Sequence, residues 1–114
     1  MDNRDIQIIG KIRKYCQEII GTHEREQYNR EFFFDAENGY SYRNAIAMPL
    51  LQIGELVKHL SDDFLSMHTE ISWRKIIRMR DYFAHHYWAV DYNLVWSTSV
   101  EDIKMLIQYL DSLH

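Results

Sequence analysis

The segment from Ser72 to Tyr87 reads SWRKIIRMRDYFAHHY and shows a pattern that recurs along the chain. Its apolar residues are spaced by three and four, as on one face of an α-helix. Ser72 is a residue type that caps helix N-termini, and it directly precedes Trp73. We therefore predict a helix from Trp73 to about His85. The inner side of this helix comprises Ile76, Ile77, Met79 or Arg80, and Phe83.

The same spacing predicts three further long helices: Asp5 to about Ile20, Tyr40–Tyr42 to about Phe64, and Asp91 through Leu113. We expect Gly21 to end the first of them, and residues 23–30 to form a polar loop. The aromatic residues 32–34 predict one or two helical turns. Pro49 removes a backbone donor, so we expect it to kink the second helix rather than end it. The sequence thus predicts an all-α fold, an up-and-down bundle of four to five helices.

The composition fits one domain spanning residues 1–114. The 114 residues include only 4 glycines and 1 proline, which disfavours a turn-rich β-sandwich. Cys16 has no partner for an internal disulfide, and no C-x-x-C pair indicates a zinc site. The longest apolar run, Ala45–Leu51, is far shorter than the roughly 18 residues of a membrane span. Since the N-terminus also lacks signal-peptide features, we expect a cytoplasmic protein that does not contact membranes.

The charge is distributed unevenly. The whole chain carries a net charge of −4, which argues against a basic coat for nucleic acid. Residues 71–80 nevertheless hold four bases and no acid, so 9 bases and 17 acids remain elsewhere. The four bases are Arg74, Lys75, Arg78 and Arg80. We expect Arg74, Lys75 and Arg78 to contact RNA phosphates or to be ordinary solvated charges; the residue types fit both.

The end of the predicted helix concentrates titratable groups. Asp81 and His85 are four residues apart and share a face, so the carboxylate can orient the imidazole. Arg80 projects some 140° away from His85 on a straight helix. Arg80 and His85 therefore meet only if the helix distorts near residues 84–86 or if a second copy of the chain supplies one of them. Surface charges beside histidines at a helix C-terminus are the simpler interpretation of the spacing alone.

Several ordered blocks of the sequence resemble the HepT-like toxins of the HEPN superfamily. The first is the motif Arg80-x4-His85-x-Tyr87. Further similar blocks are YRN at residues 42–44, QIGELVK at 52–58, SWRKIIRMR at 72–80 and YWAVDYNLVW at 87–96. Two positions depart from the family pattern: Asp81 stands where Asn is usual, and Trp88–Ala89 stands where a Gly is usual. The resemblance covers essentially the whole chain.

The resemblance implies a homodimeric ribonuclease toxin that needs no metal and no other cofactor. Arg80 would clamp the phosphate, His85 would act as general base or acid, and Asp81 would orient His85. The tyrosine matching Tyr87 accepts AMP from a nucleotidyltransferase antitoxin in this family. Tyr87 is also open to interpretation as a packed aromatic residue.

The sequence allows more than one role for several other residues, and it allows a second function. Glu55 is either structural or a charge partner for the arginine-rich segment. We expect His59 and His68 to be structural or surface residues, and Cys16 to lie in the core. An alternative function is a non-catalytic helical subunit that binds substrate or serves as a scaffold for a small nucleotidyltransferase. The sequence does not identify the RNA that is cleaved.

Overall fold

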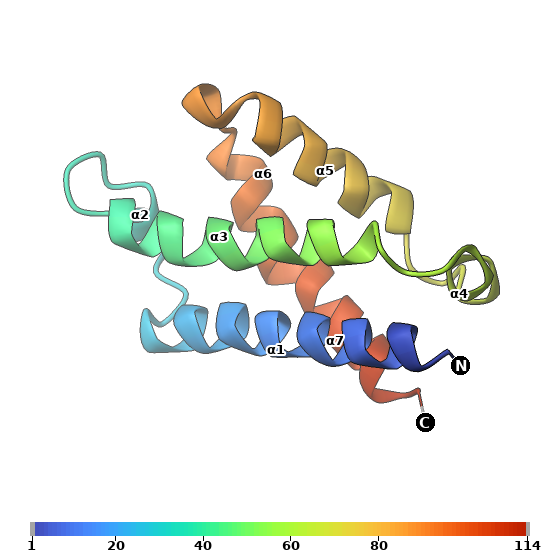
Figure 1. Cartoon of the computed structure of the whole chain (residues 1–114). Coiled ribbons are helices and arrows are strands. Elements are labelled where there is room, and N and C mark those ends of the chain that lie inside the picture. Colours follow the sequence, from blue (N-terminus) through green and yellow to red (C-terminus); the bar gives the residue numbers. More distant parts are fainter. Residues whose placement is uncertain (1, 114) are drawn as a thin grey trace.

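The computed structural model describes residues 2–113, which form helices and turns without a β-strand in that range (Figure 1). The elements in chain order are α1 (Asn3–Arg25), α2 (Arg30–Phe33), α3 (Tyr40–Val57), α4 (Asp62–Met67), α5 (Trp73–His85), the 3-10 helix η1 (Tyr87–Ala89), α6 (Tyr92–Ser97), the π-helix η2 (Thr98–Asp102) and α7 (Ile103–Asp111). The predicted all-α fold is confirmed.

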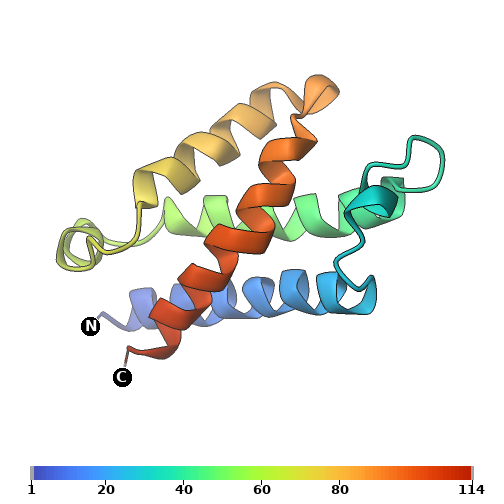
Figure 2. The same cartoon turned by 180° about the vertical axis from the view of Figure 1, so that it is seen from behind.

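Three long helices lie side by side, with α3 between α1 and α5 (Figure 1). The segments α6, η2 and α7 follow one another as a rod that crosses this layer obliquely, as Figure 2 shows from the other side. The core fills the space between the layer and the rod, and its aliphatic residues include Ile12, Ile46, Leu50 and Leu106, all nearly inaccessible to solvent. Burying each such side chain contributes roughly 2 kcal/mol of hydrophobic free energy. The buried α5 residues Trp73, Met79 and Phe83 belong to the same core and hold α5 against α3.

The first helix is longer than predicted. It continues through Gly21 to Arg25, because Thr22 and His23 are buried and extend its contact with the core. It ends where Gln27 and Tyr28 adopt left-handed backbone conformations, with φ of 56° and 52°. The predicted loop over residues 23–30 is therefore correct only for residues 26–29, since Arg30 begins α2.

The second long helix ends earlier than predicted. α3 passes through Pro49 as expected, but it stops at Val57, and Phe64 belongs to the separate helix α4. The reason is Ser61, whose hydroxyl caps α4 by accepting from the Phe64 amide. The buried carboxylate of Asp5 accepts hydrogen bonds from the Ser61 amide, at 2.9 Å, and from its hydroxyl, at 2.6 Å. This contact with α1 fixes the break.

The other two predicted helices are correct in position. α5 starts at Trp73 and ends at His85, although the Ser72 side chain makes no capping hydrogen bond. Asp91 does cap α6 by accepting from the amides of Asn93 and Leu94. The predicted single helix from Asp91 to Leu113 is interrupted by the π-helical turn η2. The periodicity thus predicted the position of this rod, but it did not predict the π-helical turn inside it.

Candidate functional site

The basic helix α5 exposes most of its charge. Arg74, Lys75 and Arg78 are all exposed, and Lys75 forms an ion pair with Asp102 at 3.2 Å. Arg80 differs from these three residues, because only 28% of its side chain is accessible and it faces α3. The predicted phosphate clamp is therefore held inside the α3–α5 contact, whereas the other bases stand on the surface.

Gly54 makes room for Arg80. A Cβ atom at Gly54 would lie 2.3 Å from the Cβ of Arg80 and 2.8 Å from its Cγ. Such distances are far below van der Waals contact, so any side chain at position 54 would push α5 away from α3. Gly54 thus sets how closely the stem of Arg80 approaches α3.

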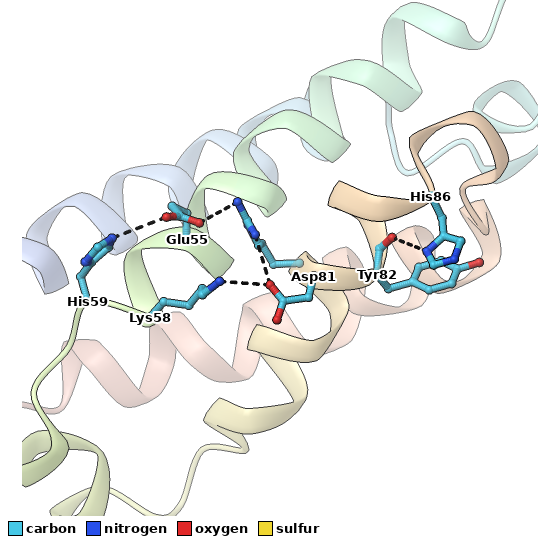
Figure 3. Close-up of polar contacts among 7 residues, drawn as sticks. Glu55, Lys58, His59, Asp81, Tyr82 and His86 are labelled. Atoms are coloured by element: carbon cyan, nitrogen blue, oxygen red, sulfur yellow. Dashed lines mark hydrogen bonds and ion pairs between the residues drawn. The ribbon is translucent and has the colours of Figure 1, made fainter.

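Glu55 fixes the other end of the Arg80 side chain. Its buried Oε2 atom lies 2.9 Å from Nη2 of Arg80, and its Oε1 lies 3.5 Å from Nε2 of His59 (Figure 3). Nη1 of Arg80 donates to Asp81 at 3.1 Å. Apart from the hydrogen bond to Asp81 and the ion pair with Glu55, the guanidinium has further N–H donors that could bind another acceptor. Glu55 is therefore the charge partner that the sequence left as one of two interpretations.

Asp81 does not contact His85 within the part of the chain that the structure describes. Its carboxylate accepts from Lys58 at 3.2 Å and from Arg80, as Figure 3 shows for the labelled Lys58–Asp81 pair. Two hydrogen bonds lower the pKa of the Asp81 carboxyl. The one from Lys58 has the larger effect, and the one from Arg80 comes second. In the single chain the carboxylate therefore binds two cations, and the orienting of His85 by Asp81 stays a prediction.

His85 is exposed at the C-terminal end of α5. α5 is a regular α-helix through this residue, so Arg80 and His85 project in different directions, some 140° apart. Of the two routes by which they could meet, helix distortion before His86 is therefore absent. The next histidine, His86, uses its Nδ1 to contact the Tyr82 carbonyl at 3.0 Å and ends the helix (Figure 3).

The backbone of Tyr87 opens the 3-10 helix η1. The side chain of this predicted AMP acceptor lies outside the described part of the structure.

A buried polar cluster around His23 was missed from the sequence. His23 is inaccessible to solvent, with Nδ1 2.5 Å from the Tyr42 hydroxyl and Nε2 2.9 Å from the Ser99 hydroxyl. Ser99 donates its own hydrogen to the Trp96 carbonyl, so it accepts from His23, and Tyr42 donates to the imidazole. Burial lowers the pKa of His23 to about 4 and raises that of Tyr42 to about 12. The cluster links α1, α3 and η2 with a neutral imidazole.

The remaining candidates agree with structural roles. Cys16 is buried, and burial raises the pKa of its thiol to about 12. His68 is 2.7 Å from the Tyr109 hydroxyl and packs on Phe64. Within residues 2–113 no three His, Cys, Asp or Glu side chains gather in a way that could hold a metal ion. Metal independence stays a prediction.

The fold and the position of the motif define the class of this protein. An all-α bundle that carries Arg80-x4-His85 at the end of a basic helix is a HEPN-type domain. Residues 6–113 match the family described as "Ribonuclease HepT-like", and the chain belongs to this family.

Curated relatives carry names of the same kind. The chain is 36% identical over 89 residues to "Probable ribonuclease HepT" of Thermococcus cleftensis, which covers 78% of this chain and 77% of the relative. It is 27% identical over 107 residues to "Putative RNase MJ1380" of Methanocaldococcus jannaschii, covering 93% and 94% of the two chains. No solved structure matches the chain. Among the described residues, no helix is long and apolar enough to cross a lipid bilayer.

Proposed function

We propose that this protein is a toxin that cleaves RNA in the cytoplasm through attack of a ribose 2′-hydroxyl on the adjacent phosphate. The O2′–P bond forms and the P–O5′ bond breaks, which leaves a 2′,3′-cyclic phosphate and a 5′-hydroxyl. The proposal rests on one observation: in a chain of the HepT-like ribonuclease family, Arg80 is held ready by Glu55 and Gly54 on the helix that ends in an exposed His85.

The two motif residues would divide the chemistry. The free N–H groups of Arg80 bind the phosphate oxygens and stabilise the charge of the pentacoordinate transition state. An imidazole nitrogen can accept or give a proton, so His85 can take the proton from the 2′-hydroxyl or give one to the departing O5′. Asp81 supports Arg80 in the single chain, and it orients His85 only if the assembled site changes its partners. Arg74, Lys75 and Arg78 contribute positive potential along α5.

A homodimer explains how Arg80 and His85 act on one phosphate. The two side chains diverge on the regular helix α5, so Arg80 of one protomer and His85 of the other would face the same cleft. We expect the purified protein to sediment as a dimer. A monomer that still cleaves RNA at micromolar concentration would contradict the shared site.

A complementation experiment tests this arrangement. Arg80→Ala and His85→Ala should each be inactive alone. After subunit exchange, a mixed dimer holds one site with both residues intact, so the mixture should recover about a quarter of the wild-type activity. Mixed dimers that form but remain inactive would contradict a site divided in this way.

The non-catalytic alternative makes a different prediction. If the chain only binds substrate or serves as a scaffold for a nucleotidyltransferase, cleavage in the preparation should not depend on Arg80 or His85. Growth arrest on inducible expression should then be equal for wild type and His85→Ala. Activity in EDTA separates the proposed mechanism from a metal-dependent nuclease, because the proposed reaction should be unaffected.

We further propose that a nucleotidyltransferase antitoxin silences the toxin at Tyr87. The phenol oxygen would attack the α-phosphate of ATP, forming a tyrosyl-AMP bond and releasing pyrophosphate. The support is the position of Tyr87, two residues after His85 and directly beyond the end of α5. AMP at this end of the helix would introduce a phosphate where RNA phosphate is expected to bind.

Intact-mass spectrometry of the co-expressed pair tests the modification. The wild-type chain should gain the mass of AMP and lose its activity. Tyr87→Phe should gain no mass and keep at least part of its toxicity, since the phenol is not the proposed base. Undiminished AMP addition to Tyr87→Phe would place the modification elsewhere, with Tyr82 and Tyr92 as the nearest candidates.

A further inference from the structure

Three aromatic rings form a row at the end of α5, which we call the aromatic row: Tyr82, His86 and Trp88. The rings of Tyr82 and His86 are stacked, with centroids 4.6 Å apart and an interplanar angle of 17° (Figure 3). The rings of His86 and Trp88 are 5.7 Å apart and tilted by 41°. The contact from His86 Nδ1 to the Tyr82 carbonyl holds the middle ring in place. The row is thus ordered by its own contacts.

The aromatic row is open to solvent. Trp88 is 70% exposed and Tyr82 is 39% exposed, whereas Trp73 at the start of α5 is only 6% exposed. Exposing so much of an indole ring forgoes hydrophobic free energy, and exposed apolar groups that cluster mark binding surfaces. The ordered and exposed rings therefore form a surface on which a flat ligand could stack.

The surroundings of the aromatic row indicate the charge of that ligand. Exposed Arg78 lies one helical turn before Tyr82, and both line a cavity of about 240 Å³ with the apolar side chains of Ile76, Met79 and Leu94. Asp102, the acidic residue that also lines the cavity, is paired with Lys75. Arg78 is thus the cation of this cavity that forms no ion pair among the described residues, and exposed aromatic rings beside such a cation are a combination that binds single-stranded nucleic acid.

We propose that the aromatic row binds an unpaired RNA base by stacking. This inference rests on the proposed function, because it assigns a base-binding subsite to the same RNA substrate. A base in a duplex is already stacked on its neighbours and gains little from the rings, so the aromatic row favours single-stranded RNA. The ring contact is tolerant of base identity, since every base has a flat face. The subsite thus selects unpaired structure rather than sequence.

Binding of a 2′-O-methyl RNA of about eight nucleotides tests the proposal, since the blocked 2′-hydroxyl prevents cleavage. Trp88→Ala should weaken binding roughly tenfold, and Tyr82→Ala should weaken it by a similar factor. Trp88→Phe keeps a ring and should bind within about threefold of wild type. Met105→Ala is the matched control, because Met105 is 63% exposed on α7, and it should bind like wild type. Circular dichroism checks the fold of each variant.

An abasic strand of the same length and charge separates stacking from electrostatics. Wild type and Trp88→Ala should bind this strand equally, because no base is left to stack. If Trp88→Ala weakens binding of both strands alike, or of neither, the aromatic row is not a base-binding site. Cleavage is measured separately with ordinary RNA. If the protein cleaves RNA through His85 but does not prefer the strand with bases, only the stacking subsite is refuted. If it prefers the strand with bases but does not cleave RNA, only the ribonuclease mechanism is refuted.

Discussion

His23 lies inside the packing of α1, α3 and η2, whereas His85 stands at the exposed end of α5. Both ring nitrogens of His23 are occupied by hydroxyl groups, and Tyr28 stacks on its ring at 4.9 Å. His85 is exposed at the end of α5, within the motif on which the family resemblance rests. One imidazole has its hydrogen bonds completed by the fold, and the other is accessible to a substrate.

The comparison separates the two uses of a titratable side chain in a small helical domain. His23 remains neutral because protonation would place a charge in the core and displace the hydrogen that Tyr42 donates. A general base needs the opposite situation, namely a nitrogen that the substrate can reach. Burial is thus the observation that sorts histidines by role, and it is not visible in residue type.

Reciprocal variants are the strongest test of this contrast. His85→Ala should lower the cleavage rate by about 10²–10⁴ and change the free energy of unfolding by less than about 0.5 kcal/mol. His23→Ala should lose about 3 kcal/mol of stability, because it leaves a cavity and the unsatisfied Tyr42 and Ser99 hydroxyls. Urea unfolding and cleavage assays at a temperature where both variants are folded provide the measurements. A large stability loss for His85→Ala would contradict the assignment of a structural role to His23 and a catalytic role to His85.

The pH dependence of the unfolding free energy tests the role of the buried residue, His23. The pKa of His23 falls from 6.5 to about 4 on folding, so between these values the unfolded chain binds a proton that the folded chain does not. The stability from His23 is therefore complete above pH 6.5 and is lost as the pH falls towards 4, by about 3 kcal/mol in total. His23→Gln cannot titrate, and its urea midpoint should change much less between pH 6.5 and pH 5. Identical pH profiles for the two chains would show that His23 titrates normally.

Substitution of glycines tests whether the close approach of α3 and α5 positions Arg80. Gly54→Ala places a methyl group against Arg80 and should cost about 2 kcal/mol of stability. It should also lower cleavage by at least about tenfold, because it displaces Arg80. Gly10→Ala in α1 is the control: a Cβ there meets nothing within 4 Å, so this variant should gain about 0.5–1 kcal/mol. If both variants behave alike, the close α3–α5 approach does not position Arg80.

The smallest effect concerns the Lys58–Asp81 pair on the surface. Lys58→Gln removes the main cause of the lowered pKa of Asp81, so that pKa should rise towards its ordinary value, as followed by NMR of the carboxyl group. The urea midpoint should hardly change, since exposed ion pairs contribute little. Lys11→Gln in α1 should leave the pKa of Asp81 as it is. An unchanged Asp81 titration in Lys58→Gln would assign the shift to Arg80 alone.

Sequence periodicity located the long helices because each buries one face, but it did not locate the C-terminal ends of α1 and α3. Burial of Thr22 and His23 carries α1 past Gly21, and the bond from Ser61 to Asp5 separates α4 from α3. These causes join residues that are distant in the chain, and local patterns do not record such partners. The position of α5 could be predicted because its apolar face and its neighbours in sequence are sufficient to define it.

The sequence proposed residues for the candidate site, but it did not predict which side chains these residues contact. The family resemblance identified Arg80 and His85, and the spacing of four placed Asp81 on the same helix face as His85. Spacing could not show that Lys58, directly after α3, binds the Asp81 carboxylate. The His23 cluster escaped for the same reason, since Ser99 is 76 residues further along the chain. Tyr42, within a block of the family resemblance, was the one available signal.

The uneven charge of the molecule has a consequence for the rate at which RNA encounters it. The net charge is −4, yet the exposed bases of α5 occupy one edge of a body 45 Å long. At about 0.01 M salt the screening length is roughly 30 Å, so an approaching strand is repelled by nearly the whole protein. At physiological salt it shrinks to about 8 Å, and a strand beside α5 responds to that helix alone. The association rate should therefore rise from low to moderate salt and fall again at higher salt. At moderate salt the charges also favour an approach in which the strand faces α5.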